Sequence, residues 1–205
     1  APERVRGTRD RSWGIRPIGA ADAQPTLPLQ MPQFFWLWAP LNFDDYITLY
    51  HRNDDAAGKP WNTRAVLAAL GSAAGQESED VGAAIDYRSG TRRVRRLRIE
   101  LRQHGSVAAR IQVEPQWHFY MPGLGYMHPE WGHGLYKGEL AVGYDSYDRA
   151  TTDDAVPGMM HIQAFSRAEL ELAGGERQLG SGIVEQLILG PHAPSGLREL
   201  FDPAA

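Results

Sequence analysis

Apolar and polar residues alternate between positions 81 and 114, and this pattern constrains the fold more than any other feature. Leucine, isoleucine and valine alternate there with arginine and glutamate, as at Leu97, Ile99 and Leu101. A period of two places successive side chains on opposite faces of a β-strand. Short turns containing glycine and serine separate the apolar series. The pattern predicts an antiparallel meander with one apolar face and one solvated face.

The composition sets limits on partners and compartment. A net charge of −4 argues against nucleic acid as the main partner. No apolar run approaches the ~18 residues of a membrane-spanning helix, so we expect no membrane span. The lack of cysteine excludes disulfides and thiolate metal sites but does not decide the compartment, for which we expect the cytoplasm. The 22 glycines and 14 prolines favour β structure with many turns.

Two strands are predicted between residues 33 and 51, with a turn at 42–45. Alternation in the first strand places Phe34, Trp36 and Trp38 on one face. Three large aromatic side chains on one face either line a cavity or fill a core. The following apolar stretch, 61–70, fits a strand or a short helix, and its β-rich context favours a strand.

Further strands are predicted along the rest of the chain, at 116–121, Leu135–Tyr147, Met159–Leu172 and Ile183–Leu189. The pattern places Trp117 with Phe119 on one face, and His161 with Gln163 and Phe165 on another. About ten strands in meander order predict an all-β, lipocalin-like up-and-down barrel. We expect a linker or extra strands at 1–32 and the barrel domain at 33–205.

Seven arginines lie between Arg88 and Arg102. They form either a basic patch or one solvated face of the sheet. Glu100 and Glu114 lie at positions that suit cross-strand partners, which favours the solvated face.

A glycine-rich stretch at 123–134 combines groups that bind, titrate and stack. It contains His128, Glu130 and His133 together with Tyr126 and Trp131. The position of this stretch between strands predicts a loop at one end of the barrel. The histidines and the carboxylate either perform acid–base chemistry or hydrogen-bond the loop backbone.

Four short motifs resemble the AttH-like tandem-calycin superfamily, which includes hydroxyneurosporene synthase (carotenoid 1,2-hydratase). They are Arg9–Gly14, Gly125–Gly134, His161-Ile162-Gln163 and Gly182–Gln186. The first is similar to the Asp-His-x-Trp-Gly element of that family, with Arg11-Ser12 in place of the histidine-containing centre.

The resemblance implies a C-terminal lipocalin-like half, with an N-terminal calycin half or a homo-oligomer as partner. It also implies an apolar terpenoid, polyketide or steroid-like ligand in a barrel pocket. The expected reaction is cofactor-free hydration, dehydration or isomerisation, so the chain is a possible hydratase or isomerase. The alternatives are a non-catalytic carrier of an apolar ligand and a structural half of a larger two-barrel protein.

The candidate residues follow from this chemistry. Alkene hydration or isomerisation needs a proton donor and acceptor beside an apolar cavity, and aromatic rings stabilise a carbocation. The catalytic candidates are Asp10, His128, Glu130 and His133. The ligand-binding candidates are Trp13, Trp36, Trp38, Trp117, Tyr126, Trp131, His161 and Gln163.

A metal site is the remaining alternative for the histidines. His128-x-Glu130-x-x-His133 is not the helical zinc motif, because Pro129 and the neighbouring glycines disfavour a helix. A zinc or iron site would need a further ligand such as His161. We expect no bound metal and no cofactor.

Overall fold

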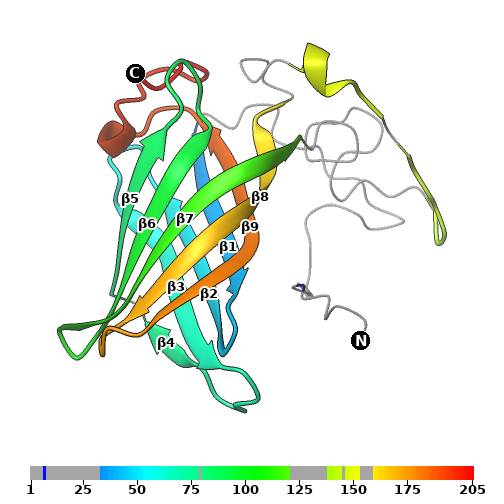
Figure 1. The fold of residues 1–205 in the computed structure, drawn as a ribbon. Helices are drawn as coiled ribbons and strands as arrows, with labels where there is room; N and C mark the ends of the chain where they lie inside the picture. Colours follow the sequence, from blue (N-terminus) through cyan, green and yellow to red (C-terminus); the bar gives the residue numbers. More distant parts are fainter. Residues whose placement is uncertain (1–6, 8–32, 79, 121–137, 145, 153–158) are drawn as a thin grey trace.

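The computed structural model is a nearly closed antiparallel β-barrel (Figure 1). It describes residues 7, 33–78, 80–120, 138–144, 146–152 and 159–205. The strands are β1 (Phe34–Asn42), β2 (Tyr46–Asp54), β3 (Pro60–Ala69), β4 (Gln76–Ser78), β5 (Val81–Tyr87), β6 (Val94–Gln103), β7 (Ser106–Tyr120), β8 (His161–Leu172) and β9 (Arg177–Leu189). Within the described residues the helical elements are 3-10 turns, η1 (Arg149–Thr151) and η3 (Ala193–Ser195).

The strand order confirms the predicted meander. The sheet runs β4-β3-β2-β1-β9-β8-β7-β6-β5, so neighbours in sequence are neighbours in space and β1 pairs with β9. The two edges of the sheet meet at a seam, where β4 and the residues that follow it contact β6. There the Ser78 hydroxyl donates to the Arg102 carbonyl at 2.7 Å, and the Arg102 amide donates to the Asp80 carbonyl at 3.1 Å. The all-β, lipocalin-like barrel predicted from the sequence is therefore confirmed.

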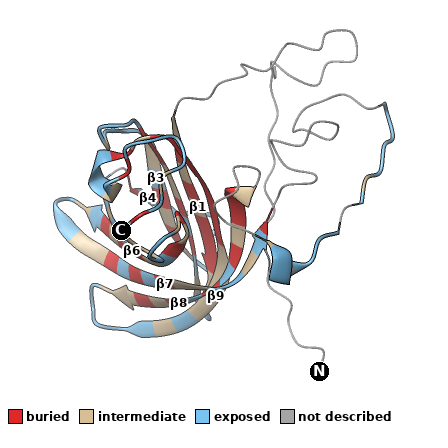
Figure 2. Cartoon of the chain, turned by 90° about the horizontal axis from the view of Figure 1, so that it is seen from above, coloured by how far each residue is buried: buried red, intermediate tan, exposed pale blue. Residues whose placement is uncertain are grey.

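Inward-facing side chains fill the barrel. The predicted alternation in β6 is confirmed, since Leu97, Ile99 and Leu101 are at most 2% exposed. In β1 the inward residues are Phe35 and Leu37, and both belong to this main core. Figure 2 shows the buried residues on the inner side of the curved sheet. The interior is therefore filled mainly by apolar side chains, whose burial holds the strands together.

Some strand predictions hold and others are wrong. Residues 60–69 form β3, which confirms a strand over a helix. The two strands predicted on either side of Pro115 are one strand, β7, with a register shift between Pro115 and Trp117. The strand predicted at Leu135–Tyr147 is wrong within its described part, which contains no strand. Leu140 and Tyr144 are about nine-tenths exposed there, because no neighbouring strand supplies a ladder.

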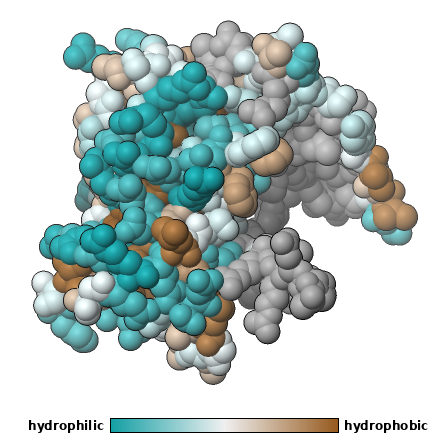
Figure 3. All heavy atoms as spheres, in the orientation of Figure 1, coloured by the Kyte–Doolittle hydropathy of each residue, from teal (hydrophilic) through white to brown (hydrophobic). Residues whose placement is uncertain are grey.

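The arginine-rich stretch forms a solvated face, as predicted. Arg96 pairs with Glu114 at 3.0 Å, and Arg102 and Arg110 both pair with Glu100. The surface in this region is mostly hydrophilic (Figure 3).

Arg92 is the exception, because it is buried and holds the C-terminal segment across one end of the barrel (Figure 1). Its guanidinium donates to the carbonyls of Gly190, Glu199 and Asp202 and to the Asp202 carboxylate.

The backbones of β1 and β9 lie close together at Gly182. A Cβ at this position would overlap the Pro40 carbonyl oxygen and lie 2.9 Å from the Leu41 Cα. Glycine is required here by the close approach of two backbones. No helix in the described part of the chain is long and apolar enough to cross a membrane.

Candidate functional site

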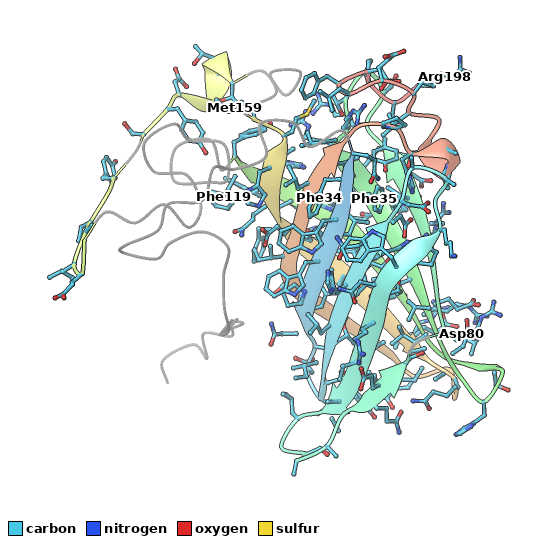
Figure 4. All side chains as sticks on the ribbon, turned by 180° about the vertical axis from the view of Figure 1, so that it is seen from behind. Phe34, Phe35, Asp80, Phe119, Met159 and Arg198 are labelled. Atoms are coloured by element: carbon cyan, nitrogen blue, oxygen red, sulfur yellow. The ribbon has the colours of Figure 1, made fainter. Side chains whose placement is uncertain are left out.

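A second apolar cluster lies on the outer face of the barrel, over β1, β8 and β9. Because Phe35 and Leu37 point inward, alternation turns Phe34, Trp36 and Trp38 outward. Phe34 and Trp36 pack on a small buried group formed by Met160, Leu187 and Leu189. Figure 4 shows this region from behind, with Phe34, Phe35 and Phe119 labelled. Three aromatics share one face as predicted, and they lie outside the barrel interior.

Strand register aligns chemical groups across this outer face. One row runs His51, Trp38, Glu185, Gln163, Phe119 over β2, β1, β9, β8 and β7. Neighbouring residues in such a row lie about 5 Å apart and face the same way. The row therefore brings a histidine, a carboxylate, an amide and two aromatic rings together from five strands.

A buried histidine–carboxylate pair is the centre of this outer face. His161 Nε2 lies 2.6 Å from Glu185 Oε1, and the two side chains are 5% and 9% exposed. The Gln163 amide donates to the other Glu185 oxygen at 3.1 Å. A carboxylate accepts hydrogen bonds, so Nε2 carries a proton and donates it to Glu185. This arrangement suits acid–base chemistry.

Trp36 lies between two histidines on the same face. Its ring centroid is 6.3 Å from the His51 ring and 6.3 Å from the His161 ring. Partial burial lowers the pKa of His51 below its ordinary value, against a smaller opposing effect of the Asn53 side chain. His51 is therefore neutral near pH 7, and either ring nitrogen can then take part in hydrogen bonding.

Large aromatic side chains extend this face beyond the pair. Trp117 is 62% exposed, Phe119 is 58% exposed and Phe165 is 45% exposed. Trp117 pairs across the strands with Phe165, and Phe119 pairs with Gln163, so all three adjoin the polar centre. Exposed aromatic groups of this size commonly mark binding surfaces. We call the set formed by Trp36, Trp38, Trp117, Phe119, Phe165, His161, Gln163 and Glu185 the outer-face site.

A shallow cavity of about 640 Å³ on the outer side of β5–β8 is a weaker candidate. Its charged lining is already paired internally. Arg110 pairs with Glu100 at 3.1 Å, and Arg177 pairs with Glu171 at 2.7 Å. A ligand there would compete with these ion pairs, whereas the outer-face site offers apolar rings.

The structure brings together five of the residues predicted from the sequence. Trp36, Trp38, Trp117, His161 and Gln163 all lie on the outer face. The other predicted site residues lie outside the described residues: Asp10, Trp13, Tyr126, His128, Glu130, Trp131 and His133.

Glu185 and His51 were missed as site residues. The available signal for Glu185 was a carboxylate at alternating register within the apolar run Ile183–Leu189. Among the described residues, no group of three or more His, Cys, Asp or Glu side chains could hold a metal ion.

Comparison with known proteins places the chain in a family. A model for a family of unknown function, DUF8625, matches residues 1–198. The chain belongs to the DUF8625 family. No curated protein and no solved structure matches it. For this DUF8625 protein the relationship to AttH-like calycins therefore stays a prediction.

Proposed function

We propose that this protein binds an apolar small molecule at the outer-face site and converts it by acid–base chemistry without a redox cofactor. The proposed reactions are hydration, dehydration or isomerisation of a terpenoid, polyketide or steroid-like substrate. The inward residues form a packed core, so we place the ligand against the outer aromatics rather than inside the barrel. The same proposal includes the calycin relationship and a cytoplasmic location. It also includes a partner, which is either an N-terminal calycin half or a second copy.

The observation that carries the proposal is the buried pair of His161 and Glu185. Transferring a carboxylate out of water is unfavourable by several kcal/mol unless it is fully paired. An apolar pair would satisfy the packing of this face at least as well. Buried titratable pairs beside an exposed apolar surface are typical of functional sites. The surrounding tryptophans add rings that stabilise positive charge.

The proposed hydration uses one proton carrier. Protonated His161 gives a proton from Nδ1 to one alkene carbon, and the positive charge develops on the other carbon next to Trp36. Water adds to that carbon and returns a proton to Nδ1, so the enzyme is regenerated and no electrons are exchanged. Glu185 holds the imidazole orientation through Nε2 and stabilises the imidazolium form.

Incubation with a panel of terpenoid, polyketide and steroid alkenes in ¹⁸O-labelled water tests the proposal. We expect a product that carries one added water, detected by mass spectrometry, and its loss in Glu185→Gln and His161→Asn. Arg96→Gln, on the solvated face, is the matched control and should keep activity. Quenching of tryptophan fluorescence reports binding independently, because Trp36, Trp38 and Trp117 line the site.

Two other outcomes separate the alternatives. Binding with the ligand recovered unchanged supports a carrier and rejects catalysis. Neither binding nor turnover across the panel rejects the outer-face site for a ligand, and leaves a structural half whose aromatics dock on another protein domain.

A further inference from the structure

The C-terminal turn brings a serine and a histidine to a carboxylate on the opposite, inner side of the barrel wall. His192 Nδ1 lies 2.6 Å from Ser195 Oγ, and His192 Nε2 lies 3.1 Å from Asp54 Oδ2. Ser195 Oγ also lies 2.8 Å from the Tyr87 hydroxyl. Asp54 and Tyr87 belong to β2 and β5, so the four groups come from three separate parts of the chain.

The proton positions in this chain of hydrogen bonds follow from Asp54. Arg52 binds both Asp54 oxygens, at 2.7 and 2.9 Å. Burial opposes ionisation of Asp54, but hydrogen bonds from His192 and Arg52 outweigh it and lower the pKa of its carboxyl. An ionised carboxylate only accepts, so His192 Nε2 donates to Asp54.

The remaining directions follow for the neutral form of His192, which is the form that acts as a base. In neutral His192, Nδ1 is the acceptor and receives the Ser195 hydroxyl proton. The Tyr87 hydroxyl must then donate to Ser195 Oγ. Burial raises the pKa of Tyr87 to about 12, which keeps this phenol protonated and able to donate.

Asp54 and His192 are buried, and Ser195 lies closer to the surface. Asp54 is 1% and His192 is 3% exposed, whereas Ser195 is half-buried at the surface of the turn. The His192 ring stacks on Phe35 with a centroid distance of 4.0 Å. In an activated serine, a buried carboxylate orients a base, and the base accepts the proton of an accessible hydroxyl. Asp54, His192 and Ser195 have this arrangement.

We propose that Ser195 is a nucleophile, activated by His192 and Asp54, that takes acyl groups from small, reactive esters. Its oxygen attacks the ester carbonyl carbon and forms the new C–O bond while its proton moves to His192 Nδ1. The bond to the alcohol oxygen breaks, and His192 gives that proton to the departing alcohol. Water repeats the sequence on the acyl-serine and releases the carboxylic acid. Tyr87 donates to the developing oxyanion or to Ser195 Oγ.

Stabilisation of the turn alone does not account for these groups. The turn is already fixed by backbone hydrogen bonds, from Ala193 N to Ala56 O at 2.8 Å and from His192 N to Leu197 O at 3.1 Å. Leu197 anchors the same segment in the core. Apolar residues in place of the buried histidine and carboxylate would serve packing equally well.

Labelling with a fluorophosphonate probe, followed by peptide mass spectrometry, tests the proposal on the intact chain. We expect Ser195 to react about a hundredfold faster than the exposed Ser106, in line with general-base activation. Ser195→Ala should abolish the fast labelling and the hydrolysis of p-nitrophenyl acetate, whereas Ser106→Ala should change neither. His192→Phe keeps a ring to stack on Phe35 but removes both nitrogens, and should slow labelling about a hundredfold.

Two results would overturn the proposal. One is labelling of Ser195 in the wild-type chain no faster than labelling of Ser106, a comparison that needs no variant to fold. The other is unchanged labelling in a folded His192→Phe variant. Variants of His161 and Glu185 should leave Ser195 labelling unaffected, so this proposal and the outer-face function fail separately.

Discussion

Removal of His161 and Glu185 together is expected to destabilise the barrel less than removal of either one. The two side chains are 5% and 9% exposed and share a 2.6 Å hydrogen bond. His161→Phe leaves a buried carboxylate with only the Gln163 donor, a change that costs about 3 kcal/mol. Glu185→Leu leaves a buried N–H group without its acceptor, which costs about 2 kcal/mol. Each single variant is therefore clearly destabilised.

The double variant replaces the pair by two apolar side chains of similar size. No buried charge then remains at these positions, and the Gln163 amide that loses its acceptor is only partly buried, so the loss should be about 1 kcal/mol or less. The single losses sum to about 5 kcal/mol, which gives a coupling energy of about 4 kcal/mol. For a chain of this size, 1 kcal/mol shifts Tm by about 3 °C, so the double variant should melt several degrees above His161→Phe.

Urea unfolding followed by tryptophan fluorescence measures all four members of this cycle. The control is the ion pair of Arg96 and Glu114, whose side chains are 35% and 42% exposed. Its coupling should lie below about 1 kcal/mol. Additive losses at His161 and Glu185, or coupling no larger than in the control pair, would refute the reasoning. A stable double variant that has lost turnover would show that the pair serves function rather than folding.

Two further predictions concern the frame around the sites. Gly182→Ala should lower the free energy of unfolding by about 1–3 kcal/mol, because its Cβ overlaps the Pro40 carbonyl. The control Gly174→Ala has open space at its Cβ and should be nearly neutral in the same unfolding assay. The lowered pKa of Asp54 means that its ionised form favours the folded state, a contribution that is present above the ordinary carboxyl pKa of about 4 and is lost as the pH falls from there through the lowered pKa of the folded state. Asp54→Asn should therefore flatten the fall of Tm over this range, and an unchanged pH dependence would contradict the assignment.

The meander was predictable because strands such as β6 and β7 have one face exposed to solvent. In β6 and β7, arginine and glutamate alternate with aliphatic residues, so a period of two identifies both the strand and its buried face. β1 lacks this contrast. Phe35 and Leu37 on one face are as apolar as Trp36 and Trp38 on the other. Alternation therefore shows which residues share a face but not which face points inward.

The failure at Leu135–Tyr147 has a different cause. Alternation of Leu140, Val142 and Tyr144 satisfies the local pattern, but a strand also needs a neighbour for its backbone hydrogen bonds. β7 and β8 pair directly with each other along their length, and so do β8 and β9. The described residues 138–144 are left beside the sheet with their apolar side chains exposed.

The polar clusters were only partly predictable, because tertiary structure creates them. Period two placed His161 and Gln163 together, yet their partner Glu185 lies 24 residues from His161 and reaches it only through the pairing of β8 with β9. Asp54 and His192 are 138 residues apart. Nothing local distinguishes either residue as part of a site.

β1 separates the two proposed sites. Trp36 on its outer side contacts His161, and Phe35, the residue before it, stacks on His192 on the inner side. Successive side chains of a strand point to opposite faces, so one strand can support both clusters without bringing them into contact. The inner cluster shares the face that carries the main core, so substitutions there affect both reactivity and folding. The outer cluster rests on a small satellite group, Met160, Leu187 and Leu189. Its buried polar pair can be exchanged for apolar residues with little loss of stability only when both partners are replaced together.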